Sequence, residues 1–268
     1  MRRFSSTILT GLPMLLWALS ALADTDGVFD EYRAMFGDEN PAIFVIDEGE
    51  ELWLTEAGPK AVTLENCDLG LGPGVVEGAY AQLPRYFQDA QRVQDLESRL
   101  EYCMIHLQGR SAAEIHARPY SLRGDLGTEM EALVAWIAEQ SRGLPIAPGQ
   151  AHVQERNAYA LGESLFYYRA GPHDFSCATC HGQPGKRIRL QALPDLTGHE
   201  GAAKAYATWP AYRISQGLVR TMGWRMRDCF RQQRMPELIM GSEASVALQT
   251  YLAVNAAGAA MAAPGLKR

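Results

Sequence analysis

The sequence predicts a mostly α-helical protein that contains two copies of one domain. Apolar residues recur at a spacing near 3.6, which is typical of amphipathic helices. Short blocks of sequence occur twice in the same order, and a Cys-x-x-Cys-His motif stands in the second copy alone. The chain has 268 residues, of which 47% are apolar, and this is enough to build more than one packed domain.

The N-terminal segment predicts export. Two arginines precede an apolar run over residues 8–19, and small residues follow it. This order is typical of a cleavable secretory signal peptide over residues 1–23. A membrane anchor is the alternative, but the run is short for a span of about 20 residues and a proline interrupts it. We expect cleavage near Ala23, a mature chain in the bacterial periplasm, and no membrane span after cleavage.

The charge of the chain argues against a nucleic-acid partner. Loss of residues 1–23 removes two arginines and no acids, so the net charge changes from −6 to −8. Five arginines nevertheless fall within 15 residues, which favours a small anionic ligand, with a solvated helix face as the alternative. They are Arg220, Arg225, Arg227, Arg231 and Arg234.

The five cysteines include one motif with a specific chemistry. Cys177, Cys180 and His181 form the Cys-x-x-Cys-His signature of covalent haem attachment. Two thiols one helical turn apart bond to the two vinyl groups, and the adjacent imidazole is held against the iron. A zinc site would need a second ligand pair, and a thioredoxin-like motif would need a βαβ context. We therefore expect one covalently bound haem c with His181 as an iron ligand.

The repeat defines two homologous domains, which we expect over residues 24–148 and 149–268. Prolines and a glycine over 144–149 suggest the linker. The matching blocks are 49–59 with 162–172 (offset 113), 79–86 with 205–212 (offset 126) and 132–138 with 247–253 (offset 115).

Four helices follow from the apolar spacing, one at each end of each copy. Residues 43–46 are also compatible with a short strand, and loops rich in glycine and proline separate the helices. Small cytochromes enclose their haem with such loops. The expected helices are 45–57, 129–141, 157–169 and 243–255.

The first copy has lost the residues that hold a haem. The first offset aligns Leu64, Cys67 and Asp68 with the haem motif, so one thiol and the imidazole are missing. The second offset aligns Cys103 with Cys229. If Cys229 lies over the iron, Cys103 and Cys67 both face the vacated pocket. We expect them to form a disulfide that contributes about 2–4 kcal/mol by restricting the unfolded chain; two separate buried thiols are the alternative.

Two residues compete as the second axial ligand of the iron. Met235 lies 54 residues after His181, where an electron-carrying cytochrome places its thioether. Cys229 is the unpaired thiol, and Arg225 precedes it by one helical turn. A nearby guanidinium lowers the pKa of a thiol and favours the thiolate, so we favour Cys229.

Residues 225–236 resemble the SoxA family, the larger subunits of the SoxAX cytochromes of thiosulfate-oxidising bacteria. Residues 67–76, 83–87 and 96–100 resemble the same family, and the similarity covers nearly the whole mature chain. The resemblance implies an L-cysteine S-thiosulfotransferase that oxidatively conjugates thiosulfate to a cysteine of the carrier protein SoxYZ. It also implies a small partner cytochrome, SoxX, that supplies another haem.

The resemblance assigns roles to two residues. It makes Cys229 both the distal haem ligand and the active-site sulfur, and it places Arg225 on the anionic substrate. A further hypothesis is that Arg220 or Arg231 also screens the charge of thiosulfate. Some family members carry a haem in the N-terminal domain, whereas this sequence matches the single-haem branch.

Two other functions remain open at this stage. One is a periplasmic electron-transfer cytochrome c in which His181 and Met235 hold the iron. The other is a subunit without catalytic activity that serves only for docking. The first predicts a high reduction potential, and the second predicts assembly that survives the loss of Cys229.

Overall fold

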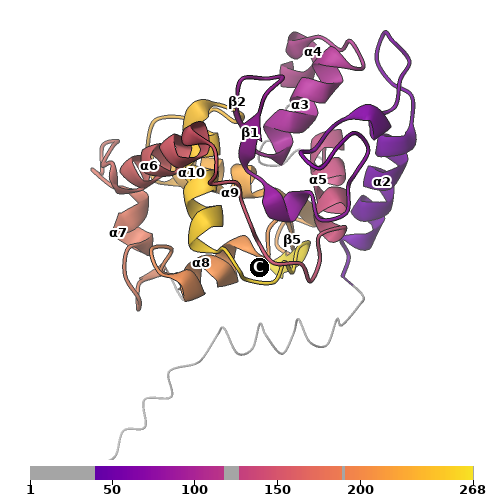
Figure 1. Ribbon diagram of the computed structural model, residues 1–268. Helices are drawn as coiled ribbons and strands as arrows, with labels where there is room; N and C mark the ends of the chain where they lie inside the picture. The colour runs from indigo at the N-terminus through magenta and orange to yellow at the C-terminus, as the bar shows by residue number, and fades with distance from the viewer. Residues whose placement is uncertain (1–39, 118–126, 189–190, 268) are drawn as a thin grey trace, which may run out of the picture.

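The computed structural model describes residues 40–117, 127–188 and 191–267. The predicted signal peptide over residues 1–23 lies outside them. The described residues are mostly helical, with strands of two or three residues (Figure 1). None of the helices in these ranges is both long and apolar enough to cross a membrane.

The elements of the first copy lie together on the right of Figure 1. They begin with a long helix and end with the helix that packs against it. In chain order they are α2 (Ile43–Leu54), the 3₁₀ helices η1 (Leu64–Asn66) and η2 (Tyr80–Gln82), β1 (Arg85–Phe87), β2 (Arg92–Gln94), α3 (Leu96–His106), α4 (Ala112–Ala117) and α5 (Glu129–Glu139).

The second copy repeats this plan, and its helices α6, α7 and α8 lie on the left of Figure 1. In chain order its elements are α6 (Val153–Tyr167), α7 (Cys177–His181), β3 (Arg187–Ile188), β4 (Gln191–Ala192), α8 (His199–Tyr206), β5 (Ala211–Arg213), β6 (Leu218–Arg220), α9 (Met222–Gln232), α10 (Glu243–Asn255) and β7 (Gly265–Lys267).

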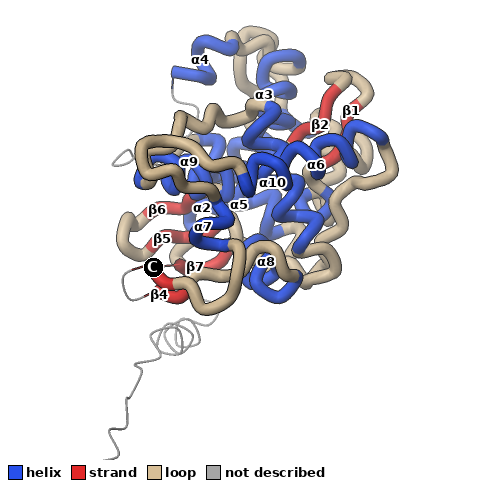
Figure 2. Tube along the Cα trace, turned by 90° about the vertical axis from the view of Figure 1, so that its left-hand side faces the viewer, coloured by secondary structure: helices blue, strands red, loops and turns tan. Residues whose placement is uncertain are grey.

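The repeat found in the sequence is present in the structure. The hairpin β1–β2 and helix α3 recur 126 residues later as β5–β6 and α9, with the same bounds. Both hairpins are antiparallel and have the same register. In the second copy β7 adds a parallel strand to β5, which gives the three-stranded sheet β6–β5–β7 near the C-terminus (Figure 2).

A glycine lets the first and last helices of each copy cross closely. A Cβ atom at Gly49 in α2 would collide with the carbonyl oxygen of Ala132 in α5. Gly162 in α6 stands in the same relation to Ala247 in α10. Packing at this distance requires a residue without a side chain, which explains why both copies have glycine here.

The predicted helices are present with small shifts of their ends. Residues 43–46 belong to α2, so the short strand considered for them is wrong. The side chain of Asn40 accepts a hydrogen bond from the backbone N–H of Ala42 at 3.0 Å just before the helix begins. The helix then packs along α5. Its apolar residues therefore need the helical spacing that puts them on one face toward α5.

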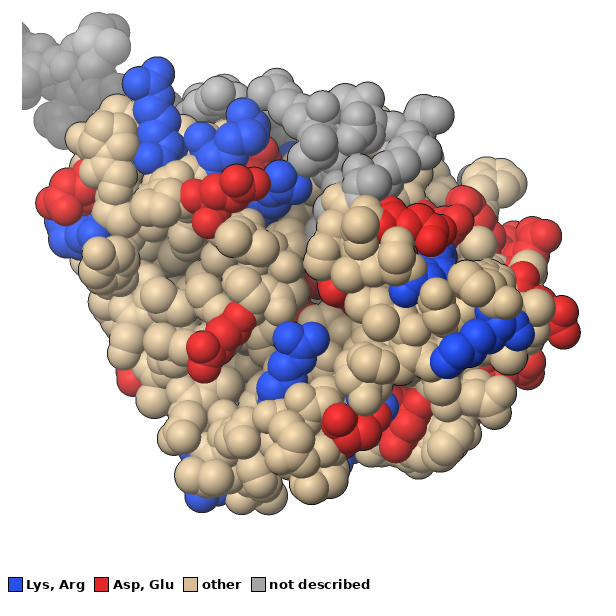
Figure 3. Space-filling view, turned by 90° about the horizontal axis from the view of Figure 1, so that it is seen from above, with Lys and Arg blue, Asp and Glu red and all other residues tan. Residues whose placement is uncertain are grey.

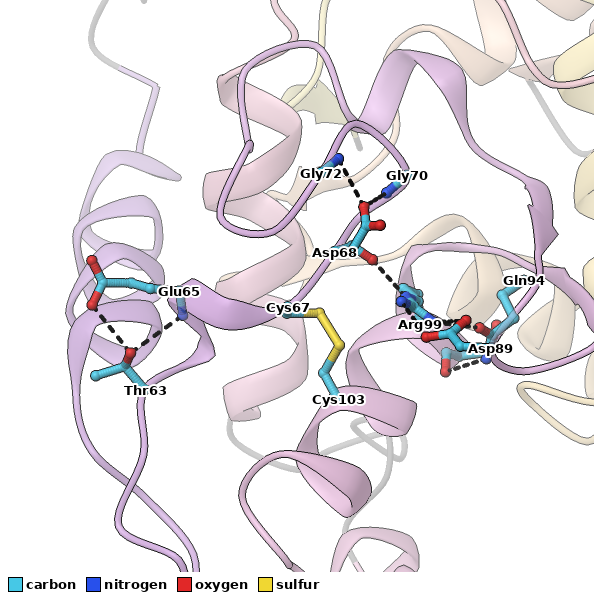
Figure 4. Close-up of a disulfide and its surroundings, with 11 residues drawn as sticks. Thr63, Glu65, Cys67, Asp68, Gly70, Gly72, Asp89, Gln94, Arg99 and Cys103 are labelled. Carbon is cyan, nitrogen blue, oxygen red and sulfur yellow. Dashed lines mark hydrogen bonds and ion pairs between the residues drawn. A yellow bond between two sulfur atoms is a disulfide. The ribbon is translucent and has the colours of Figure 1, made fainter.

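The predicted disulfide between Cys67 and Cys103 is present (Figure 4). The S–S distance is 2.00 Å and the Cα atoms are 5.7 Å apart. Both cysteines are buried in the main hydrophobic core, where the bond joins the segment after η1 to α3. The two thiols therefore pack against each other within the first copy, as the repeat predicted.

The predicted linker over residues 144–149 is held by both copies. Ile146 is buried, and its backbone N–H donates to the carbonyl of Ala259 at 2.9 Å. The N–H of Ala147 donates to the carbonyl of Ala81 in the first copy at 2.7 Å. Because one hydrophobic core contains buried residues from both copies, this segment joins two packed halves rather than spacing them apart.

Candidate functional site

The haem-attachment motif forms a short helix with a fixed start. Ser176 caps α7 by accepting a hydrogen bond from the backbone N–H of Thr179 at 3.2 Å, and the Thr179 hydroxyl accepts one from the N–H of Ser176 at 2.9 Å. Cys177 and Cys180 are therefore one helical turn apart, and both are free thiols. His181 follows at the end of the same helix.

The ring of His181 is held in one orientation. Its Nδ1 lies 2.9 Å from the carbonyl oxygen of Pro194, a geometry in which Nδ1 donates and Nε2 is left to bind a metal. Burial lowers the pKa of His181, and the hydrogen bond to Pro194 opposes this shift. The neutral imidazole that a metal requires is thus the favoured form.

A cavity of about 440 Å³ adjoins these three residues. Its walls come from both sides of the second copy and include many apolar side chains. Two free thiols on one helical turn, an oriented neutral imidazole and a largely apolar enclosure fit a covalently bound haem c. Lining residues include Phe166, Cys177, Cys180, His181, Trp209, Arg213, Arg225, Cys229, Met235 and Leu252.

Helix α9 brings the predicted active-site residues to this cavity. Thr221 caps its first turn by accepting a hydrogen bond from the N–H of Trp224 at 3.0 Å. Arg225 and Cys229, one turn apart, both line the cavity. Met235, the competing axial ligand, lines it as well. The structure therefore brings both candidate ligands to the predicted haem pocket.

The thiol of Cys229 does not have the lowered pKa expected from the sequence. Burial raises its pKa, and the positive charge of Arg225 opposes that shift without overcoming it. The arginine acts in the predicted direction, but the removal of the thiol from water is the larger effect. A bound metal ion favours the thiolate of a cysteine ligand far more strongly than a neighbouring arginine does.

The five clustered arginines have different environments in the structure. Arg220 is fully buried and pairs with Glu131 of α5 at 3.1 Å, so it is not placed to screen an incoming substrate. Arg227 pairs with Glu237 at 3.1 Å on the surface, and Arg231 pairs with Asp228 at 2.7 Å. Of these five, Arg225 alone lines the cavity. Figure 3 shows acidic and basic side chains interspersed over one face of the molecule.

Sequence reasoning missed three basic residues of the cavity wall, Lys204, Arg213 and Lys267. Arg213, at the end of β5, lines it together with Arg225 and Cys229. Arg213 stands outside the arginine cluster in the sequence, and in the hairpin β5–β6 it pairs with Leu218. The repeat contained the signal, because the offset of 126 aligns Arg213 with Phe87 of the first copy.

Comparison with known proteins decides the family. The family model "SoxA/TsdA, cytochrome c domain" matches residues 48–146 and 161–261. The L-cysteine S-thiosulfotransferase subunit SoxA of Hydrogenophilus thermoluteolus is 52% identical over 89% of this chain and 87% of that protein. This chain belongs to the SoxA family. Because both copies match a cytochrome c domain, the predicted fold of two such domains and the predicted cofactor class, haem c, are confirmed.

Other SoxA relatives agree with this assignment. A subunit of the same name from Hydrogenobacter thermophilus is 31% identical over 85% of this chain and 82% of that protein. The crystal structure of SoxXA from P. pantotrophus superposes with a TM-score of 0.72 over 89% of this chain and 84% of that chain, at 21% identity. That structure supports the fold.

Proposed function

We propose that this SoxA chain is the catalytic subunit of a periplasmic L-cysteine S-thiosulfotransferase. The observation that carries the proposal is one cavity lined by both the haem-attachment residues and a cysteine with an arginine one turn before it. A relative that is 52% identical bears this activity in its name. The substrate pair is thiosulfate and a cysteine of a SoxYZ-like carrier protein.

The reaction joins two sulfur atoms and releases electrons. A carrier thiol and the terminal sulfur of thiosulfate form one S–S bond, with loss of one proton and two electrons. We place the reaction at Cys229. In the first step the Cys229 sulfur bonds to the terminal sulfur of thiosulfate, with loss of the thiol proton and both electrons. In the second step a carrier thiolate attacks that terminal sulfur and displaces the Cys229 thiolate. The two electrons would pass to c-type haems, each of which can accept one.

Each residue at the site has a distinct part in this proposal. Cys177 and Cys180 would hold the haem covalently, and His181 and Cys229 would bind its iron. Arg225 contacts the anionic substrate beside Cys229, supported by its position one turn earlier in α9. The haem supplies a redox centre and a positive iron when bound.

We infer one haem per chain, in the domain over residues 149–268. The domain over residues 24–148 has Leu64 and Asp68 where the other has a haem-bonding cysteine and the iron-binding histidine. Its remaining cysteine in that motif, Cys67, is bonded to Cys103. With one haem here and two electrons to pass on, a second haem protein is required, and we propose a SoxX-like small cytochrome c that forms a heterodimer with this chain. A solved relative of the fold is a SoxXA complex.

Electron paramagnetic resonance of the oxidised protein tests the ligand assignment. Wild type should give a low-spin signal with compressed, thiolate-type g-values, and Cys229→Met should lose that signal, keep the haem and abolish conjugation of thiosulfate to a carrier thiol. Met235→Leu is the matched control, because its side chain lines the same cavity and should leave both signal and turnover unchanged.

The second candidate function is a periplasmic electron carrier with His181 and Met235 on the iron, which the position of Met235 in the cavity wall favours. It predicts a weak near-infrared sulfur-to-iron band, a high reduction potential and a spectrum that changes in Met235→Leu instead. Full turnover in Cys229→Met would rule out the proposed thiosulfotransferase site.

A further inference from the structure

One position of the repeat carries an uncharged residue in the first copy and a charged residue in the second. The offset of 126 residues relates β1–β2–α3 to β5–β6–α9 element by element. It aligns Arg99 with Arg225, so each copy has an arginine one turn before the cysteine of that helix. It also aligns Phe87 with Arg213. The second copy has therefore placed a second arginine where the first copy has an aromatic ring.

In the first copy the charge of Arg99 is fully partnered. Its two terminal nitrogens each lie 2.9 Å from a carboxylate oxygen of Asp89, and its Nε donates to the carbonyl of Asp68 at 2.6 Å (Figure 4). The guanidinium also stacks on the ring of Phe87, 4.1 Å from its centroid. This arginine stabilises the fold of the haem-less domain and has no donor directed at a ligand among these contacts.

In the second copy the acidic and the aromatic partner are both replaced. Ser215 stands where Asp89 stands in the first copy, and Arg213 replaces the aromatic ring. Arg225 has an acidic neighbour of its own, Asp228, at 3.5 Å. The Nε of Arg213 is buried and has no hydrogen-bond partner within the described part of the chain. A buried charged donor without a partner is costly, which points to a group that the bound ligand supplies.

The two arginines of the second copy face a common space. Both line the cavity that Cys229 lines. Burial lowers the pKa of Arg213 to about 10, and the positive charge of Arg225 is the next cause. Arg213 is thus still protonated at neutral pH, and two like charges are held near each other beside the thiol. A dianion between them would relieve this repulsion and satisfy the free donor.

We propose that Arg213 and Arg225 together form the receptor for the sulfonate end of thiosulfate, with its terminal sulfur directed at Cys229. The proposal rests on the thiosulfotransferase function above and adds a substrate-binding residue to that site. Guanidinium groups suit this role because each can donate two parallel hydrogen bonds to a tetrahedral oxyanion. Holding the three oxygens would leave the terminal sulfur as the free end of the substrate, which is the end that must react.

Anion binding to the haem-loaded heterodimer, without carrier protein, tests the receptor. Calorimetric titration with thiosulfate, and with sulfate as an unreactive anion, should show binding weakened on the order of tenfold or more in Arg213→Gln. Arg213→Lys should retain most of the affinity. Arg213→Phe reproduces the first copy and should behave like Arg213→Gln. Arg227→Gln, on the same helix as Arg225 but outside the cavity wall, should match wild type.

A second readout separates this role from contact with the haem itself. The haem absorption spectrum, haem content and reduction potential should be unchanged in Arg213→Gln, and KM for thiosulfate should rise more than kcat falls. Unchanged anion affinity would overturn the proposal, and a shifted potential with unchanged affinity would assign Arg213 to a haem propionate. If wild type conjugates thiosulfate and its KM does not change in Arg213→Gln, the receptor is wrong and the proposed function stands. If wild type binds the anion through Arg213 but does not conjugate it, the proposed function is wrong and the receptor stands.

Discussion

A buried glutamate of the first domain lies against the helix that carries Cys229. Glu97 of α3 is buried, and an added side chain at Gly223 of α9 would contact its carboxylate oxygens. Gln249 of α10 donates to Glu97 at 3.3 Å and also to Asp95. Burial, together with the nearby charges of Asp95 and Glu131, raises the pKa of Glu97 to about 8. At neutral pH this carboxyl group is therefore mainly protonated.

The raised pKa of Glu97 predicts a pH-dependent stability. Between the unfolded value of 4.5 and the folded value of about 8, the folded state binds more protons, so the free energy of unfolding should fall as pH rises through this window. Glu97→Gln removes the titrating group and should be more stable than wild type at pH above about 8, by about 1–3 kcal/mol. Urea unfolding at several pH values measures this.

The control for this prediction is Glu50→Gln, an exposed glutamate of α2. Its pH profile should follow that of wild type. An unchanged profile in Glu97→Gln would mean that Glu97 is not the group whose ionisation destabilises the protein at high pH. Asp95, whose pKa burial also raises, would then be the next residue to replace.

In both domains the first and last helices cross closely at a glycine. In the second domain α6 and α10 meet at Gly162, and the ring of Phe166 lies 5.0 Å from that of Tyr251, centroid to centroid. These helices form one wall of the haem cavity through Phe166 and Leu252. Their packing therefore positions one wall of the site.

Replacement of Gly162 by alanine should reverse the usual effect of that substitution. Alanine in place of glycine inside a helix normally stabilises it by about 0.5–1 kcal/mol. Here the added methyl group collides with the backbone of α10, so we expect a loss of about 1–3 kcal/mol in the free energy of unfolding. Thermal unfolding measures the stability, and Ser164→Ala, exposed on the same helix, is the control. A more stable Gly162→Ala protein would contradict the close crossing.

The sequence predicted those elements that have a long apolar pattern or a specific motif. The helices that contain Gly49 and Gly162 were found from their spacing, and the disulfide followed from the alignment of two repeats. The hairpins β1–β2 and β5–β6 were missed because three residues are too few to show a strand period. The position of Arg220 was also missed, because its partner Glu131 lies 89 residues away in the other copy. Contacts of this kind depend on how the two domains pack.

The whole molecule is joined by polar contacts buried between the two copies. Arg220 and Glu131 form an ion pair whose two side chains are each 1% exposed. Arg220 also stacks on Trp224 of α9, 4.8 Å from the ring centroid, and its Nε donates a hydrogen bond to Oε1 of Gln216 at 3.0 Å. The pair therefore connects α5 of the first domain to the start of the helix that carries Arg225 and Cys229. This arrangement gives the first domain a role in positioning the site.

Removal of Arg220 should destabilise the whole chain more than removal of a surface arginine. Arg220→Met leaves Glu131 buried without its charged partner, and we expect a loss of about 3–5 kcal/mol. Arg169→Met breaks an exposed pair with Asp174 and should cost no more than about 1 kcal/mol. In the double variant Arg220→Met, Glu131→Gln the loss should be smaller than the sum of the single losses, because no buried charge is left unpaired. Additive losses in denaturant unfolding would show that the pair does not couple the two domains.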